Sequence, residues 1–407
     1  MMGEWKKYKL KDVCIILGDG LHGTPIYDDK GEFFFINGNN LKDGRISIKN
    51  DTKRVPYSEA NKYKKPLNNR TILVSINGTI GNVAKYQDEK CILGKSACFF
   101  NVKENVDLNF IYYVVANQQF KNTITQLATG TTIKNVSLET MRNYTFCIPP
   151  LSIQKQIGKI LSSFDDKIEL NRRINDNLEQ QAQALFKSWF VDFDPFKDEK
   201  FVESELGRIP EGWRVERLGS VCKCLLGGTP SRNKEEYWNG KIAWINSGEI
   251  NEFRITKPSE YITQEGLKKS ATKLLPKKTT VLAITGATLG QVSLLEIDSC
   301  ANQSVIGLLE NEDIFHEYIY PLIKNRIDDL CSHMTGGAQQ HINKNNVEQL
   351  EILIPPKKIL VEYKQIATPI YSLISNICFE SQKISKLRDS LLPRLMSGEL
   401  KLDKINN

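Results

Sequence analysis

Two long segments of the chain place apolar side chains at alternating spacings of three and four residues. Both begin directly after a Pro-Pro pair, at residues 149–150 and 355–356. The apolar positions are Ile153, Ile157, Ile160, Phe164, Ile174, Leu178, Leu185 and Trp189 in the first segment, and Ile359, Tyr363, Ile366, Ile370, Leu373, Ile377, Ile384, Leu387, Leu391 and Leu395 in the second. Such a sustained heptad pattern predicts two helices of about 40 residues, roughly 60 Å long, packed as a coiled coil. The alternative is that each helix packs on its own globular domain.

One polar residue interrupts each apolar series, Asn171 in the first and Glu380 in the second. Isolated polar residues in such a seam fix the register of the paired helices. If the helices run antiparallel, the two halves of the chain are related by a pseudo-twofold axis.

The stretches before the two helical segments have a different pattern. Short runs rich in β-branched and aromatic residues, such as 72–76 and 280–285, are separated by Gly, Asn and Pro. Helical stretches intervene, for example 109–120 and 314–330. This pattern predicts mixed α/β globular domains with short strands.

The second half of the chain repeats the first. Trp5, Leu10 and Val13-Cys14 return in the same order as Trp213, Leu218 and Val221-Cys222, about 208 residues later. Agreement in order along both halves indicates a duplication of one domain-plus-helix unit. The predicted division is residues 1–150 and 213–356 for two homologous globular domains, 151–191 and 357–398 for the helices, 192–212 for a linker and 399–407 for a tail.

Composition narrows the class of protein. The 407 residues carry a formal net charge of +7, which permits a polyanionic partner without requiring one. No apolar run approaches the ~20 residues of a membrane-spanning helix. The nine cysteines are scattered, without zinc-site spacing, so we expect a reduced cytoplasmic protein and no metal site. No methyltransferase, nuclease or phosphate-loop motif is present, so we expect no catalytic residue in this chain.

Basic residues gather at corresponding places in the two halves. Residues 1–150 hold 21 Lys/Arg and 14 Asp/Glu, whereas residues 213–356 hold 16 and 17, so only the first half is basic overall. The two local groups are Arg54, Lys62, Lys64, Lys65 and Arg70 in the first half and Lys268, Lys269, Lys273, Lys277 and Lys278 in the second. Both suit contacts with DNA phosphates. The alternative is that these residues form a solvated charged surface, which is the more common role of a cluster of like charges in a sequence.

Polar loops also match between the halves. Thr131, Thr132 and Lys134 lie in one of them, and Gln339, Gln340 and Lys344 lie in the other. Amide and ammonium groups of this kind read base edges in the major groove. They are also ordinary loop residues, so both interpretations stay open. The residues shared by the two halves repeat while the loop sequences differ. This difference favours two domains that each recognise a different half of a DNA site.

Several longer phrases carry a family resemblance that covers essentially the whole chain. They are Ile148-Pro149-Pro150-Leu151, Phe186-Lys187-Ser188-Trp189-Phe190-Val191-Asp192-Phe193-Asp194-Pro195, Leu206-Gly207-Arg208-Ile209-Pro210-Glu211-Gly212-Trp213 and Leu391-Leu392-Pro393-Arg394-Leu395-Met396-Ser397-Gly398-Glu399-Leu400. With the duplication, the chain resembles the specificity subunit of type I restriction–modification systems. The resemblance implies two target recognition domains that read a bipartite, asymmetric DNA site, joined by spacer helices.

The resemblance also implies partners. Double-stranded DNA, two methyltransferase subunits and restriction/motor subunits would bind this chain. The partner subunits, rather than this chain, would use S-adenosylmethionine, ATP and Mg²⁺. Apolar residues at the helix ends are predicted to dock the methyltransferase subunits, with helix-end core packing as the alternative. They are Phe186, Trp189, Phe190, Phe193, Leu391, Leu392, Leu395 and Met396.

Two other classes of function remain open at this stage. One is a non-functional or recombination-donor scaffold copy with the same fold, which neighbouring genes would reveal. The other is a self-contained modifying enzyme with fused recognition domains, which methyl transfer by the purified chain alone would reveal. The DNA target and the gap between half-sites depend on which side chains reach base edges and on DNA bending.

Overall fold

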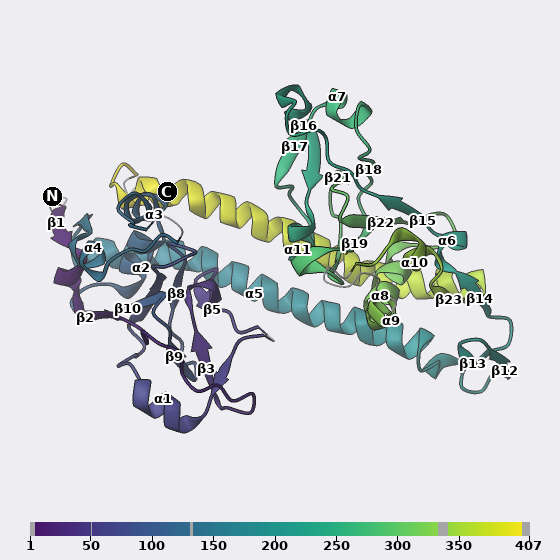
Figure 1. Cartoon of the computed structure of the whole chain (residues 1–407), viewed down its shortest axis with the longest axis horizontal. Coiled ribbons are helices and arrows are strands. Elements are labelled where there is room, and N and C mark those ends of the chain that lie inside the picture. Colours follow the sequence, from purple (N-terminus) through teal and green to yellow (C-terminus); the bar gives the residue numbers. More distant parts are fainter. Residues whose placement is uncertain (1–4, 50, 131–132, 333–340, 401–407) are drawn as a thin grey trace. The chain divides into compact units, whose positions relative to one another are not determined.

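The computed structural model describes residues 5–49, 51–130, 133–332 and 341–400. The chain forms two compact units: unit 1 comprises residues 1–167 and 384–407, and unit 2 comprises residues 168–383. Two long helices, α5 (Leu151–Phe190) and α11 (Lys357–Met396), each contribute residues to both units (Figure 1).

The globular domain of unit 1 is built on two small sheets. The main sheet is antiparallel, in the order β2 (Cys14–Asp19), β10 (Ala97–Val102), β7 (Thr71–Ser75) and β8 (Val83–Lys85). The second sheet has the order β6 (Arg54–Val55), β3 (Phe33–Ile36) and β9 (Cys91–Leu93), and β3 and β9 are parallel. The remaining strands are the pair β1 (Lys6–Lys9) and β11 (Thr145–Ile148) and the pair β4 (Leu41–Lys42) and β5 (Arg45–Ile46). The helices are α1 (Tyr57–Tyr63), α2 (Leu108–Ala116), α3 (Gln118–Gln126) and α4 (Leu138–Asn143).

The globular domain of unit 2 repeats this plan. Its main antiparallel sheet has the order β15 (Lys223–Leu226), β22 (Val305–Leu309), β19 (Thr280–Ala283) and β20 (Val292–Leu294). Its second sheet has the order β17 (Glu260–Ile262), β16 (Trp238–Ile245), β21 (Ser299–Ala301) and β18 (Leu274–Leu275). The outer pair is β14 (Arg214–Arg217) with β23 (Glu351–Ile354). The helices are α6 (Leu218–Val221), α7 (Gln264–Lys268), α8 (His316–Asn325), α9 (Ile327–Ser332) and α10 (Lys344–Glu348).

The two domains correspond strand for strand in their main sheets. In each, the first and last strands of the domain pair with one another, and the second sheet contains one parallel pair, β3 with β9 and β16 with β21. The fold class predicted from the repeat is therefore confirmed: two homologous mixed α/β domains joined by two long helices.

The two helices pair with each other inside unit 2, and their direction follows from the contacts. Asn171 of α5 donates to Glu380 of α11 (Nδ2 to Oε2, 2.7 Å), and Asn175 donates to Cys378 Sγ at 3.3 Å. Further along α5, Phe190 packs on Tyr363, with ring centroids 4.7 Å apart. In successive contacts the residue number on α5 rises while the residue number on α11 falls, so the two helices run antiparallel. The two predicted polar interruptions contact each other directly.

The apolar seam predicted for α11 is partly wrong. Ile366, Leu373 and Leu387 are 46–48% exposed, whereas Ala367 and Ile374 are fully buried. The physical reason is that the helix packs on two partners at once. Residues of α5 and α11 belong to the same hydrophobic cluster as the domain of unit 2, so the buried stripe is wider than a coiled-coil seam and lies on a neighbouring face. Both alternatives, helix pairing and packing on the domain, are therefore realised.

The segment predicted as a linker has regular structure. After α5 come a short 3-10 turn (Asp194–Phe196) and the hairpin β12 (Phe201–Ser204) with β13 (Gly207–Pro210). Phe193 and Phe196 each lie 5.3 Å from the ring of Trp213, centroid to centroid. The aromatic contacts hold this connection against the start of the second globular domain.

Candidate nucleic-acid interface

The two predicted basic groups lie on corresponding elements. In unit 1, α1 follows the edge strand β6 of the second sheet, and in unit 2, α7 follows the edge strand β17. Lys62 is on α1, and Lys268 is the last residue of α7. The fold therefore puts basic side chains from the two domains at the same place in each domain.

Most of the first group is accessible. Lys62 and Lys64 are exposed, Lys65 is half-buried, and the exposed Arg54 lies on β6 with its guanidinium 4.6 Å from the centre of the Phe34 ring. These four residues lie on or beside β6 and α1. They provide positive charge suited to phosphate contacts.

Arg70 has a different environment from the rest of its group. Its Nε donates to the carbonyl of Val102 at 2.9 Å, and one terminal nitrogen donates to the carbonyls of Lys103 (2.8 Å) and Val106 (2.7 Å). These bonds satisfy carbonyls at and just after the end of β10. The contacts favour a structural role for Arg70 over the predicted phosphate contact, because three of its five N–H donors are already committed.

The second group is split in a similar way. Lys268, Lys273 and Lys277 are exposed. Lys269 is exposed and pairs with Glu265 at 2.7 Å, one turn earlier on α7. Lys278 is half-buried and lies 3.0 Å from Glu296, whose side chain is only 2% exposed. The ion pair with the buried Glu296 carboxylate occupies the Lys278 ammonium. Lys268, Lys273 and Lys277 are therefore the strongest candidates for phosphate contacts in this group.

The polar loops also take corresponding positions. Residue 136 follows the first loop, and its N–H donates to the carbonyl of Ile76, just after β7, at 2.8 Å. The N–H of Ile342 donates to the carbonyl of Ile284, just after β19, at 3.0 Å. Each loop therefore returns to the end of the central strand of its main sheet. Four predicted base-reading residues lie outside the described residues: Thr131, Thr132, Gln339 and Gln340.

Two predicted base-reading residues lie in the described parts of these loops, and only one of them is exposed and available to DNA. Lys134 is exposed, and its carbonyl accepts from Gly78. Lys344 is half-buried at the start of α10 and pairs with Glu348 at 2.9 Å. Sequence reasoning missed Asn77, which lies 3.4 Å from Asn135 of the loop, Nδ2 to Oδ1. The Asn-Gly turn after a buried strand was the available signal.

The predicted docking residues lie mainly inside the domains. Phe190 is 4% exposed and packs on Tyr318 (4.9 Å) and Tyr363 (4.7 Å), centroid to centroid. Phe186, Leu392 and Leu395 are buried, and Trp189, Phe193, Leu391 and Met396 pack against the same clusters while keeping part of their surface. Burial favours the core-packing alternative, because a buried ring has no surface to offer a partner.

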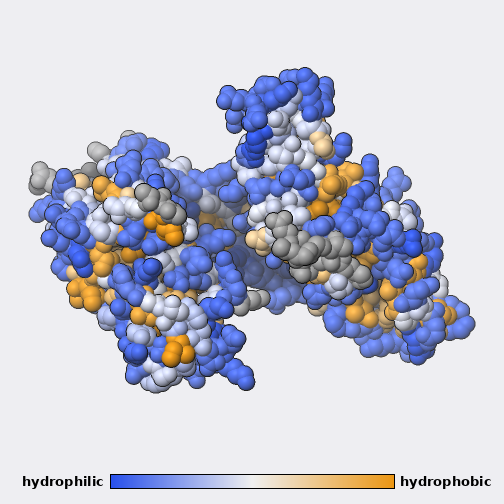
Figure 2. All heavy atoms as spheres, in the orientation of Figure 1, coloured by the Kyte–Doolittle hydropathy of each residue, from blue (hydrophilic) through white to orange (hydrophobic). Residues whose placement is uncertain are grey.

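Other apolar residues of the helices are exposed instead. Leu170 and Ile174 lie four residues apart on α5, and Ile366 and Leu373 lie seven apart on α11, so each pair shares a helix face. Figure 2 shows a mainly hydrophilic surface on which hydrophobic residues occur in separate groups. Contiguous exposed apolar surface marks interaction sites, so these pairs are candidates for contact with a partner.

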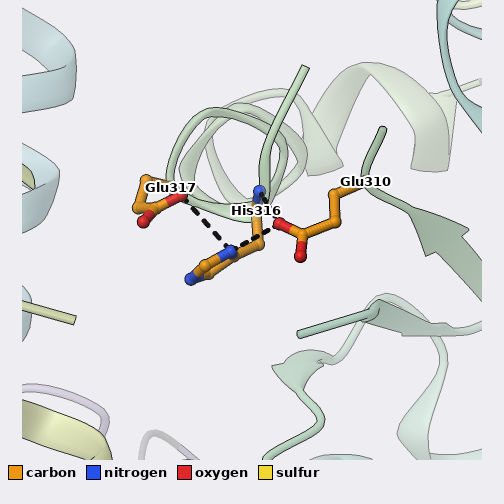
Figure 3. A group of neighbouring side chains, drawn as sticks. All are labelled: Glu310, His316 and Glu317. Carbon is orange, nitrogen blue, oxygen red and sulfur yellow. Dashed lines mark hydrogen bonds and ion pairs between the residues drawn. The ribbon is translucent and has the colours of Figure 1, made fainter. Parts of the chain in front are cut away.

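Among the described residues, one group has side chains close enough to hold a metal ion together: Glu310, His316 and Glu317 (Figure 3). His316 Nδ1 lies 2.7 Å from Glu310 Oε2 and 3.3 Å from Glu317 Oε2. Both carboxylates therefore face the same ring nitrogen of His316. Partial burial raises the pKa of Glu310, but the hydrogen bond and charge of His316 outweigh this and leave that pKa below its ordinary value. We interpret the group as a cluster of mutually contacting side chains at the start of α8 rather than as a metal site.

Comparison with known proteins identifies the class. The model of the type I restriction modification DNA specificity domain matches residues 2–180 and 210–389. Because these matches cover most of the chain, it belongs to this family.

Individual proteins similar to this chain are specificity subunits of the same family. The chain is 28% identical over 344 residues to the type I restriction enzyme MjaIX specificity subunit of Methanocaldococcus jannaschii, covering 82% of this chain and 78% of the relative. It is 23% identical over 478 residues to the HindI specificity subunit of Haemophilus influenzae, covering 98% and 100%. The crystal structure of a type I restriction–modification S subunit from M. genitalium shares the fold, with a TM-score of 0.55, 18% identity and coverage of 97% and 96%. In the described part of the chain, no helix has the length and apolar character needed to cross a bilayer.

Proposed function

We propose that this chain is the DNA specificity subunit of a type I restriction–modification complex, and that each globular domain reads one half of a bipartite, asymmetric site. The observation that carries the proposal is the correspondence between the domains. The same two places in each domain, the helix after the edge strand and the loop beside the central strand, present basic or polar residues. The loops differ in sequence, as two different half-sites require.

In this proposal the chain itself carries no catalytic group. Two methyltransferase subunits bind it and supply methyl transfer from S-adenosylmethionine, and restriction subunits use ATP and Mg²⁺. The proposed docking surface consists of the exposed apolar residues Leu170, Ile174, Ile366 and Leu373. Their exposure and shared helix faces support it, in place of the buried aromatic residues at the helix ends.

The test is a methylation map. The chain is co-expressed with the methyltransferase subunit encoded beside it, and modified adenines in the host DNA are located by sequencing. We expect one motif with two unequal halves separated by a fixed gap. Absence of any modification, with both proteins folded and associated, would contradict the proposal and favour the silent-copy alternative. A chain that methylates DNA alone would contradict the non-catalytic role.

Variants of the basic residues sharpen the test. Replacing Lys268 alone, or Lys273 alone, with Gln should weaken binding to all DNA sequences about equally, because phosphate contacts carry no sequence information. The matched control is Lys269→Gln, which removes a lysine that is already paired with Glu265. We expect a smaller effect from this control.

A further inference from the structure

Arg254 is a fully buried arginine in the domain of unit 2. Its side chain has 0% exposure. One terminal nitrogen donates to Glu179 Oε2 at 2.8 Å, and the other donates to the hydroxyl of Tyr320 at 2.9 Å. Its Nε faces Glu296 Oε1 at 3.8 Å. A guanidinium in this position is therefore shared between two carboxylates that come from different parts of the unit.

Both carboxylates connect the domain to the long helices. Glu179 belongs to α5, and it also accepts from Lys324 of α8 at 2.8 Å. Glu296 accepts from Ser375 Oγ of α11 at 2.8 Å. One buried network thus joins the globular domain to both helices at once, and the contacts all lie within unit 2.

Electrostatics keep the Glu179 carboxylate of this network charged. Burial alone would raise the pKa of Glu179, but the positive charges of Arg254 and Lys324 and their hydrogen bonds lower it to about 2. Buried ion pairs add little net stability compared with apolar packing. They do penalise every arrangement in which a charge loses its partner. The network therefore restricts how the domain sits on its two helices more strictly than apolar contacts alone would.

We propose that Arg254, Glu179 and Glu296 form a positioning group that fixes the tilt of the second recognition domain on α5 and α11 and so selects the gap between the two half-sites. This inference rests on the proposed function. For a domain roughly 30 Å across, a tilt of about 7° moves its far side by ~3.4 Å, one base-pair step. A loosened domain would accept sites with one base pair more or fewer.

The experiment uses the full chain in complex with its methyltransferase subunits. The substrates carry both mapped half-sites at the mapped gap or at gaps one and two base pairs shorter or longer. The test variant is Arg254→Met with Glu179→Met, which removes one positive and one negative charge, roughly keeps side-chain volume and leaves Glu296 paired with Lys278. We expect its methylation preference for the mapped gap over neighbouring gaps to fall by about tenfold, because DNA deformation no longer has to absorb the mismatch. Both half-site sequences should stay the same.

Two further variants separate positioning from general destabilisation. Val281→Ala removes part of a buried side chain in a cluster that includes no residue of α5 or α11. It should lower stability and leave gap preference unchanged. Ser375→Ala keeps every charge but removes the bond from α11 to Glu296, and we expect a weaker relaxation in the same direction, about threefold.

The outcomes are distinct. Gap preference within about twofold of the parent chain in both the paired variant and Ser375→Ala would overturn the positioning role. If the paired variant fails to fold, Ser375→Ala alone decides. Equal relaxation by Val281→Ala would also overturn it, since loss of stability would then explain the effect. A parent chain that gives no two-part motif would instead contradict the proposed function.

Discussion

Phe190 offers the sharpest test of whether the aromatic helix end belongs to the core or to a docking surface. Its ring contacts Phe186, Tyr318 and Tyr363, with centroids 5.2, 4.9 and 4.7 Å away, and it is 4% exposed. Phe190→Ala removes most of a buried ring and leaves a cavity among other rings. Such truncations cost about 3–5 kcal/mol, and the lost aromatic contacts place this one toward the upper end.

The assay is urea unfolding of the purified chain followed by tryptophan fluorescence, with Leu373→Gln as the matched control. Leu373 is 46% exposed, so its replacement should change stability by less than about 0.5 kcal/mol. We expect Leu373→Gln to weaken binding of the methyltransferase subunit without unfolding the chain. The reasoning would be refuted if Phe190→Ala left stability within about 1 kcal/mol and abolished that binding.

Three further predictions concern other parts of the chain. Lys62→Gln with Lys64→Gln should lower DNA affinity and make the plot of log affinity against log salt shallower by roughly two, measured by fluorescence anisotropy; an unchanged slope would argue against phosphate contacts. Asn171→Leu should destabilise the helix pair by about 1 kcal/mol because it removes the hydrogen bonds that the buried Asn171 amide donates to Glu380 and Ser381; a thermal melt of the variant beside the parent chain measures this, and an unchanged melting temperature would contradict it. The pKa of Glu179 is depressed to about 2, so its stabilisation is present above about pH 5 and disappears as the pH falls toward 2, a loss of about 3 kcal/mol; urea titrations from pH 7 to 3 should show a flatter profile for Glu179→Gln.

The repeat and the heptad pattern predicted the fold class because both are properties of spacing. Trp5 and Trp213 open two domains whose main sheets have the same strand order. Asn171 and Glu380 stood out as single polar residues in apolar series, and they form a hydrogen bond in the structure. Such spacing patterns can be read from the sequence because helix and strand geometry determine which residues share a face.

The candidate site was harder to predict because charge and apolarity do not reveal which partner a side chain uses. Arg70 looked like its basic neighbours, but backbone carbonyls 32–36 residues further along the chain occupy three of its N–H donors. Ile366 fitted the heptad, but the helix packs on a domain as well as on α5, so Ala367 is the buried residue. Both environments come from long-range contacts, which no local pattern contains.

The pairing of the first and last strands in each domain has a consequence for how the gene can change. Lys6 lies opposite Ile148 in one pair, and Arg214 lies opposite Ile354 in the other, so each domain enters and leaves its framework at neighbouring points. A genetic crossover on either side of these strands would exchange a complete reading module between alleles and keep both helices. New DNA specificities are then accessible in one recombination step, without the many point mutations that remodelling a single interface would need.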